Sequence, residues 1–179
     1  MRGYFAVGID GVSKPMNLGN LLRIAHAFDA SFFFTINAQV KNTDVHLSDT
    51  SHAEGQIPVY RYGSAAEFRL PQDCRLVGVE ITDEAVELPR FRHPMRAAYV
   101  FGAERMSLSE PVLKACEFVV KIPTRFSINV GMAGAIVLYD RVLSLGGYPA
   151  RPVRPGGKTD EVPPPHRWGA PLARIAQRR

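Results

Sequence analysis

The sequence contains few cysteines and no long apolar run, and each absence excludes a class of protein. Its two cysteines, Cys74 and Cys116, lack the CxxC or Cys/His spacing of metal sites. We therefore expect buried thiols in a reducing cytoplasm and no metal. No apolar run approaches the roughly 18 residues of a membrane span, and the opening residues, MRGYFAVGID, lack the apolar segment of a secretory signal. These absences predict a cytoplasmic protein without a membrane partner.

An excess of charge of one sign is also missing over most of the chain. The formal net charge is +5, and residues 151–179 alone carry six Arg and one Lys against Asp160 and Glu161. The first 150 residues are therefore neutral overall. A basic end favours a phosphate-rich partner, or it only keeps the chain in solution. The composition predicts a folded domain over 1–147 and a basic, Pro/Arg-rich tail over 148–179 without a core of its own.

Apolar runs with turn signals predict strands that alternate with helices. We expect strands at 4–10, 31–36, 57–62, 74–81, 96–102 and 117–123, and helices at 17–28, 64–68, 109–116 and 129–147, with a loop at 44–56. The expected N-caps are Asn17, Ser64, Ser109 and Asn129. Because the strands are continuous Val/Ile/Phe runs, the pattern favours an α/β layered domain with a largely parallel sheet.

The first predicted helix carries a single arginine on its polar side. In NLGNLLRIAHAFDA, residues 17–30, the leucines gather on one side, and Arg23 lies opposite beside Gly19, Asn20 and Ala27. A solvated helix face usually carries pairs of Lys and Glu. A lone arginine among small residues instead fits a close contact with a partner chain or a specific task for the side chain.

Three motifs follow one another along the chain: NLGNLLRIA (17–25), YVFGAERMSLS (99–109) and IPTRFSINVGMAGAIVLYD (122–140). In this order they resemble the N-x-G-x-x-x-R, F-G-x-E-x-x-G-L and I-P…S-x-N-V motifs of the SpoU (TrmH-type) branch of the SPOUT RNA methyltransferases. The resemblance extends over residues 4–145. It implies an α/β fold with a mostly parallel sheet and a C-terminal trefoil knot, which the residue pattern on its own does not predict because threaded chains are rare.

The resemblance also implies an activity. Such an enzyme transfers a methyl group from S-adenosylmethionine to a ribose 2′-hydroxyl of RNA, leaves S-adenosylhomocysteine, and works as a homodimer. The residues of this chain that the resemblance assigns to the cofactor are Gly102, Ala103, Ile122, Ser127 and Ile128. Val79 and Glu80 join them because they lie at the end of a predicted strand, where ligands of open parallel sheets bind. Those that it assigns to catalysis are Arg23, Asn17, Glu104, Ser127 and Asn129.

Several of these residues also have a purely structural interpretation. Glu104 either orients Arg23 or Asn17 through charge-assisted hydrogen bonds or is an exposed carboxylate. The small residues at 131–135 either belong to a cofactor site or simply let a helix pack closely on a sheet. Ser127 and Asn129 can cap that helix while holding the active-site loop.

The task of Arg23 has two possible forms. As a general base it would lose a proton, and a guanidinium with a pKa of about 13 loses one at pH 7 only at a cost of roughly 8 kcal/mol. As a bidentate hydrogen-bond donor, here called a fork, it would hold an RNA phosphate and stabilise the developing alkoxide. Both forms make Arg23 essential.

The chain departs from the family pattern at two places. Ser107 stands where the second motif has a glycine, and the segment between Ile122 and Ser127 is shorter than in the family. The shorter segment changes the expected contacts at Thr124, Arg125 and Phe126. Neither departure removes a group that carries out chemistry.

Other functions compete with this one. We expect the dimer itself, without a separate RNA-binding domain before the folded body, to hold the RNA, which favours tRNA over rRNA as the substrate. A non-catalytic RNA-binding protein on the same scaffold is the second alternative, and calorimetry with S-adenosylmethionine would separate it from an enzyme. A Rossmann-type nucleotide enzyme is disfavoured because no G-x-G-x-x-G follows any predicted strand.

Overall fold

The computed structural model describes residues 3–40, 55–103 and 107–148. By its internal contacts the chain divides into two units, Met1–Gly147 and Tyr148–Arg179, and all elements below belong to the first. Most of the predicted loop at 44–56, Glu104, and the predicted tail beyond Tyr148 lie outside the described residues.

The described residues form one seven-stranded sheet in which every pairing is parallel. Its order is β3-β2-β1-β6-β4-β7-β5. The strands are β1 (Tyr4–Asp10), β2 (Phe32–Ile36), β3 (Val59–Tyr62), β4 (Arg75–Val79), β5 (Val86–Glu87), β6 (Arg96–Gly102) and β7 (Phe118–Lys121). The predicted α/β fold with a largely parallel sheet is confirmed, and the trefoil knot stays a prediction. The sequence did not reveal the short edge strand β5, because it lies in the acidic stretch 82–88, which has no continuous apolar run.

In the part of the chain that the structure describes, three helices accompany the sheet: α1 (Pro15–Ala27), α3 (Glu110–Ala115) and α4 (Val130–Ser144), with a 3₁₀ turn, η2 (Leu88–Arg90). The helices predicted at 17–28, 109–116 and 129–147 are thus confirmed. The helix predicted at 64–68 is wrong. There, the amide of Glu67 bonds to the carbonyl of Ser64 at 3.2 Å, and the Glu67 carboxylate accepts from the amide of Gly63 at 3.0 Å, which closes a turn.

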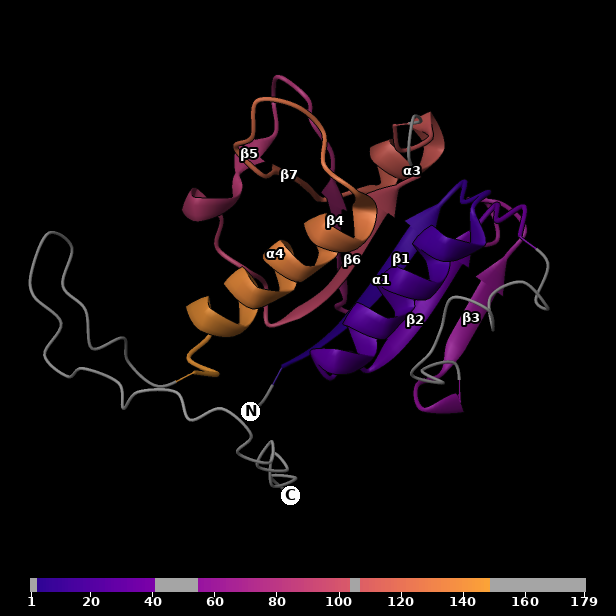
Figure 1. Ribbon diagram of the computed structural model, residues 1–179, viewed down its shortest axis with the longest axis horizontal. Helices are drawn as coiled ribbons and strands as arrows, with labels where there is room; N and C mark the ends of the chain where they lie inside the picture. Colours follow the sequence, from indigo (N-terminus) through magenta and orange to yellow (C-terminus); the bar gives the residue numbers. More distant parts are fainter. Residues whose placement is uncertain (1–2, 41–54, 104–106, 149–179) are drawn as a thin grey trace, which may run out of the picture. The chain divides into compact units, whose positions relative to one another are not determined.

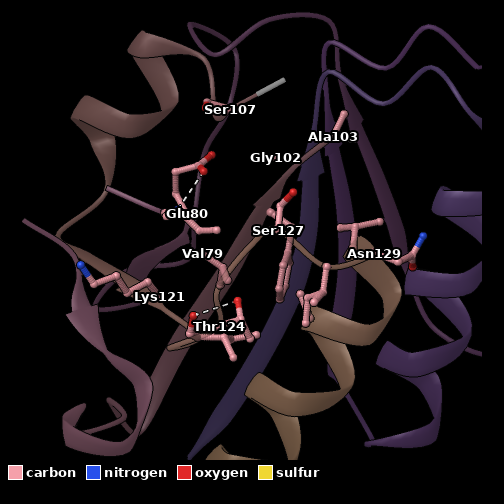
Figure 2. Close-up of a pocket in the computed structure, with 15 residues that line it drawn as sticks. Val79, Glu80, Gly102, Ala103, Ser107, Lys121, Thr124, Ser127 and Asn129 are labelled. Carbon is pink, nitrogen blue, oxygen red and sulfur yellow. Dashed lines mark hydrogen bonds between the residues drawn. The ribbon is translucent and has the colours of Figure 1, made fainter. Parts of the chain in front are cut away.

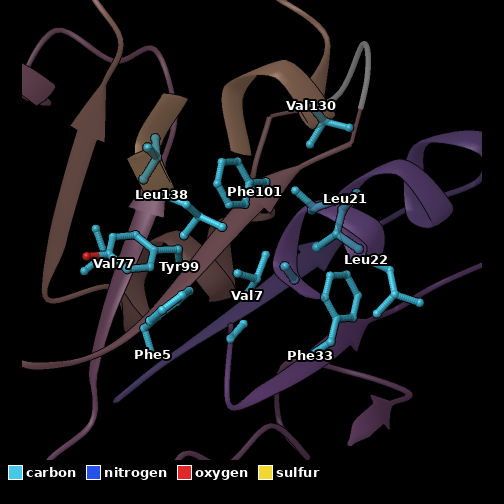
Figure 3. Packing of buried hydrophobic residues seen from close by; sticks show 14 of the residues in the cluster. Phe5, Val7, Leu21, Leu22, Phe33, Val77, Tyr99, Phe101, Val130 and Leu138 are labelled. Carbon is cyan, nitrogen blue, oxygen red and sulfur yellow. The ribbon is translucent and has the colours of Figure 1, made fainter. Parts of the chain in front are cut away.

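Each face of the sheet has its own core, because successive residues of a strand point to opposite faces. Alternate residues of β1, including Phe5 and Val7, pack with helix residues such as Leu21 and Leu138 (Figure 3). Ala6, between them in the sequence, packs on the other face, with Phe34, Leu76 and Val112 of α3.

Helices α1 and α4 pack against each other over the same face of the sheet (Figure 1). A Cβ on Gly134 of α4 would lie 2.5 Å from Cδ1 of Leu21 of α1, and one on Gly131 would lie 3.3 Å from Cβ of Asn20. The small residues of α4 therefore serve close packing, as the structural interpretation expected, but against a helix rather than the sheet. This packing brings the first and third motifs together.

The open side of α1 differs from the prediction. Arg23 and Ala27 are exposed, Asn20 is half-buried beside α4, and Gly19 is buried within the protomer. Gly19 therefore does not belong to a surface that a partner chain can approach, because contacts within this chain already cover it.

Candidate functional site

A pocket of about 510 Å³ lies at the carboxyl ends of strands β4, β6 and β7 (Figure 2). Its walls are the ends of these strands, the segment 122–129, and the first turn of α4. Ligands of open parallel sheets bind outside the carboxyl ends of the strands. The volume falls within the range of small-molecule and cofactor sites, about 300–1,000 Å³. Position and size both indicate a ligand site.

Glu80 fixes one wall of the pocket. One carboxylate oxygen accepts from the amide of Ile81 at 2.8 Å, and the other accepts from the amide of Leu108 at 2.9 Å. The end of β4 is thereby tied to the chain that enters α3. Because both oxygens hold backbone amides, Glu80 sets the position of the wall as well as contributing to its surface.

Asn129 links the opposite wall to helix α1. Its Oδ1 accepts from the amide of Gly131 at 2.9 Å, so it caps α4, as the sequence predicts. Its Nδ2 donates to Oδ1 of Asn17 at 3.4 Å. One side chain therefore starts the helix and joins motifs that lie far apart in the sequence.

Asn17 is not the N-cap of α1, so that prediction is wrong. The cap position is Lys14, without a side-chain hydrogen bond to the helix. Pro15 follows it, and proline is preorganised for the first helical position, so the helix begins before Asn17. Asn17 instead lies in the first turn, is 4% exposed, and faces α4 through its bond to Asn129.

The structure gathers most of the residues that the sequence assigns to the site. The pocket is lined by all seven residues expected to hold the cofactor: Val79, Glu80, Gly102, Ala103, Ile122, Ser127 and Ile128. Of the five residues expected to be catalytic, Ser127 and Asn129 line the pocket and Asn17 bonds to Asn129. Arg23 is exposed on α1 and does not line the pocket. Glu104 lies outside the described residues.

Sequence reasoning missed two charged groups at this edge of the sheet. Lys121, the last residue of β7, lines the pocket, and its Nζ donates to the carbonyl of Thr82 at 3.0 Å. Asp10, the last residue of β1, is buried, and its Oδ2 accepts from the amide of Ser109 at 2.7 Å. The signal was available, because both directly follow apolar strand residues.

Neither cysteine of this chain lines the pocket. Cys74 and Cys116 are free and half-buried, and burial raises the pKa of the Cys116 thiol to about 12. Such a thiol stays protonated and unreactive.

Within residues 3–40, 55–103 and 107–148, no cluster of three or more potential metal ligands occurs. None of the helices in these ranges has the length and apolar character that crossing a membrane requires.

The capping role of Asn129 can be tested by mutation. We expect Asn129→Ala to lower the free energy of unfolding by about 1 kcal/mol, because the cap is lost. Asn129→Asp keeps the capping oxygen, and the side-chain amide of Asn17 can turn so that its NH2 group donates to the new carboxylate. Its stability is therefore expected to stay within about 0.5 kcal/mol of the wild type. Urea denaturation of both variants measures this. Equal losses of stability would contradict the capping role of Asn129.

Fold and pocket together define an α/β protein with a ligand site at the carboxyl edge of a parallel sheet. The family model of the SpoU rRNA Methylase family matches residues 4–139. The chain therefore belongs to the SpoU rRNA methylase family.

Relatives from several organisms share this region. The chain is 30% identical over 146 residues to the 23S rRNA (guanosine-2'-O-)-methyltransferase RlmB of Nitrosomonas europaea, covering 74% of this chain and 53% of that protein. It is 23% identical over 137 residues to the tRNA (guanosine(18)-2'-O)-methyltransferase TARBP1 of Mus musculus, covering 72% of this chain and 9% of that protein. The chain thus spans less than two thirds of the length of either relative.

A solved structure has the same fold. The SpoU methyltransferase AviRb from Streptomyces viridochromogenes, in complex with AdoMet, superposes with a TM-score of 0.71 at 20% identity, covering 81% of this chain and 59% of that one.

Proposed function

We propose that this chain transfers a methyl group from S-adenosylmethionine to a ribose 2′-hydroxyl of RNA. One observation carries the proposal: all seven residues that the sequence assigns to the cofactor line one pocket. Five were assigned from the motifs, and Val79 and Glu80 from their place at the end of a predicted strand. Family membership supports it, as do the activities of the two relatives, which are 2′-O-methyltransferases of tRNA and rRNA.

The pocket suits the cofactor in shape and chemistry. Apolar side chains such as Val79, Phe101 and Ile122 offer surfaces for an adenine ring, and the strand ends and segment 122–129 offer main-chain groups for its polar edges. Gly102 has no Cβ, so its backbone can contact a ligand directly. When bound, S-adenosylmethionine supplies the electrophilic methyl group.

The protein's own groups would position the acceptor. An oriented hydroxyl next to the methyl group gains several kcal/mol from proximity alone. Arg23 is exposed on α1, where an RNA phosphate can reach it, and removing a proton from a guanidinium is costly. It therefore fits a clamp on that phosphate and a stabiliser of the developing alkoxide better than a base. The bond between Asn129 and Asn17 connects the pocket wall to the helix that carries Arg23. Glu104 is proposed to orient Arg23 or Asn17.

The favoured substrate is tRNA, with rRNA as the alternative, and the basic residues of 151–179 are proposed to add phosphate contacts.

We also propose that the chain acts as a cytoplasmic homodimer. Met132, Ile136 and Tyr139 form an exposed apolar stripe along α4, and Met16 is exposed on the adjacent α1, with exposed fractions of 42–66%. Such a stripe is unusual on a monomer surface and fits a second copy. Sedimentation should give a dimer at micromolar concentration.

The function is tested with the full chain in two measurements. Calorimetry should detect one S-adenosylmethionine per chain. Labelled methyl transfer, followed by mapping of 2′-O-methylation, should show the product on tRNA from a strain that lacks this gene. Transfer to rRNA alone would correct the substrate. Cofactor binding without transfer to either RNA would favour a non-catalytic RNA-binding protein, and no cofactor binding would refute the proposal.

A further inference from the structure

The segment that closes the pocket also presents an exposed aromatic ring. Thr124 and Ser127 line the pocket (Figure 2), whereas Arg125 and Phe126 between them do not. Phe126 is 76% exposed, the largest fraction for any large apolar side chain in the part of the chain that the structure describes. Arg125 is exposed as well. Arg125 and Phe126 therefore lie outside the cofactor pocket, although the segment 122–129 that carries them forms part of its wall.

The exposure of Phe126 does not come from a loosely held backbone. The hydroxyl of Thr124 donates to the carbonyl of Phe126 at 2.8 Å, and the amide of Thr124 donates to the carbonyl of Ile122 at 2.7 Å. Beyond the pair, Asn129 anchors the segment to α4 through its capping bond. The backbone is thus held on both sides of Phe126, whose ring is exposed.

We propose that Phe126 is a stacking platform for an unpaired RNA base beside the nucleotide whose ribose enters the pocket, with Arg125 on a neighbouring phosphate. This inference rests on the proposed function. Proteins that read single-stranded RNA stack splayed-out bases on aromatic rings and arginine planes. Phe126 directly precedes Ser127, so a base on its ring is next to the nucleotide at the pocket. The positive charge of Arg125 favours RNA over the apolar surface of a second copy.

The test compares RNA affinity of the full chain with that of three single variants, at one fixed salt concentration because phosphate contacts are salt-dependent. The probe is a pool of unmodified tRNA transcripts. Phe126→Ala is expected to bind about 5- to 150-fold more weakly, the range of one lost base–aromatic stack. Phe126→Trp should bind the tRNA pool as tightly as the wild-type chain does, or more tightly. Tyr60→Leu, which removes an exposed ring on β3 at the far edge of the sheet, should bind unchanged.

A fluorescence readout separates stacking from a general loss of structure. Trp168 is the only tryptophan, so Phe126→Trp in a Trp168→Phe background carries one indole, at the proposed platform. Its emission should be quenched when the tRNA pool is added. The affinity for S-adenosylmethionine and the sedimentation of every variant should match the original.

Three results would overturn the inference. Affinity of Phe126→Ala within twofold of the original, in a chain that still methylates RNA, would refute the platform and leave the proposed function intact. A change from dimer to monomer in Phe126→Ala would assign the ring to an interface between copies. A wild-type chain that binds neither the tRNA pool nor unmodified rRNA transcripts would refute the platform and the proposed function together.

Discussion

Replacing Arg23 with alanine is expected to lower kcat for methyl transfer by about 10²–10³-fold, the usual loss when one donor to a developing oxyanion is removed. Affinity for S-adenosylmethionine should not change, because Arg23 does not line the pocket. Stability should change by less than about 0.5 kcal/mol, since the side chain is exposed. Single-turnover methyl transfer, calorimetry and urea denaturation measure these three quantities.

The control is Arg75→Ala, which removes the same charge from an exposed arginine. Arg75 lies at the amino end of β4, whereas the pocket lies at the carboxyl ends of the strands. It should retain activity. Arg23→Lys separates the forms of the clamp, because lysine keeps the charge but cannot form a bidentate fork. Full activity of Arg23→Lys would refute the fork, and full activity of Arg23→Ala would remove Arg23 from the mechanism.

The second large effect is expected at Arg141, a buried arginine in the last turn of α4. It is 3% exposed, and its guanidinium donates to the carbonyls of Pro94 at 2.6 Å and Met95 at 2.9 Å and to the hydroxyl of Tyr99 at 3.2 Å. The guanidinium also lies over the Phe5 ring, 5.1 Å from its centroid. A buried charge persists only with such a set of acceptors.

Arg141→Met is expected to lower the free energy of unfolding by about 3 kcal/mol or more. It removes the donor from the part-buried carbonyls of Pro94 and Met95 and from the buried hydroxyl of Tyr99. An acceptor left buried without a donor costs about 1–3 kcal/mol. The matched control is Arg75→Met, whose ion pair with Glu117 at 2.8 Å is solvent-exposed and contributes at most about 1 kcal/mol. Urea denaturation compares the two. Similar losses for both variants would contradict a structural role for the buried guanidinium.

The pH dependence of stability gives an independent readout of Arg141. His93 bonds to Asp140 at 2.9 Å and to Tyr99 at 2.6 Å, and its pKa is lowered by burial and further by Arg141, against an opposing effect of Asp140. In the unfolded chain His93 is protonated near pH 6.5, whereas in the folded chain it is protonated only at lower pH. The free energy of unfolding therefore decreases as the pH falls through about 6.5. Without the charge of Arg141, this decrease should be smaller in Arg141→Met.

The candidate site could be anticipated from the sequence because it is built from strand ends. An apolar run that stops at a polar or glycine residue marks the end of a buried strand, and parallel strands all end at one edge of the sheet. This is why Glu80, Gly102 and Ile122, far apart in the chain, are in one pocket. The same rule would have found Asp10 and Lys121 if it had been applied to β1 and β7.

The errors have a common origin in packing and competition between neighbouring residues. Asn17 has the composition of an N-cap, but Pro15 starts the helix earlier, and the asparagine then bonds across to Asn129. Gly19 looks like part of an open face because a helical wheel shows one helix at a time. The contact between α1 and α4, visible only in the folded chain, decides which side of each helix is open.

The sequence by itself determined the alternation of strands and helices, the family, and the residues that surround the pocket, because periodicity and short motifs are local properties. Only the tertiary structure decided that Asn129 joins Asn17, that Arg141 is buried while Arg23 and Phe126 are exposed, and that Glu80 braces the pocket wall. These depend on which groups meet when distant segments pack. A charged or aromatic side chain has no fixed role until its neighbours remove it from water or leave it there.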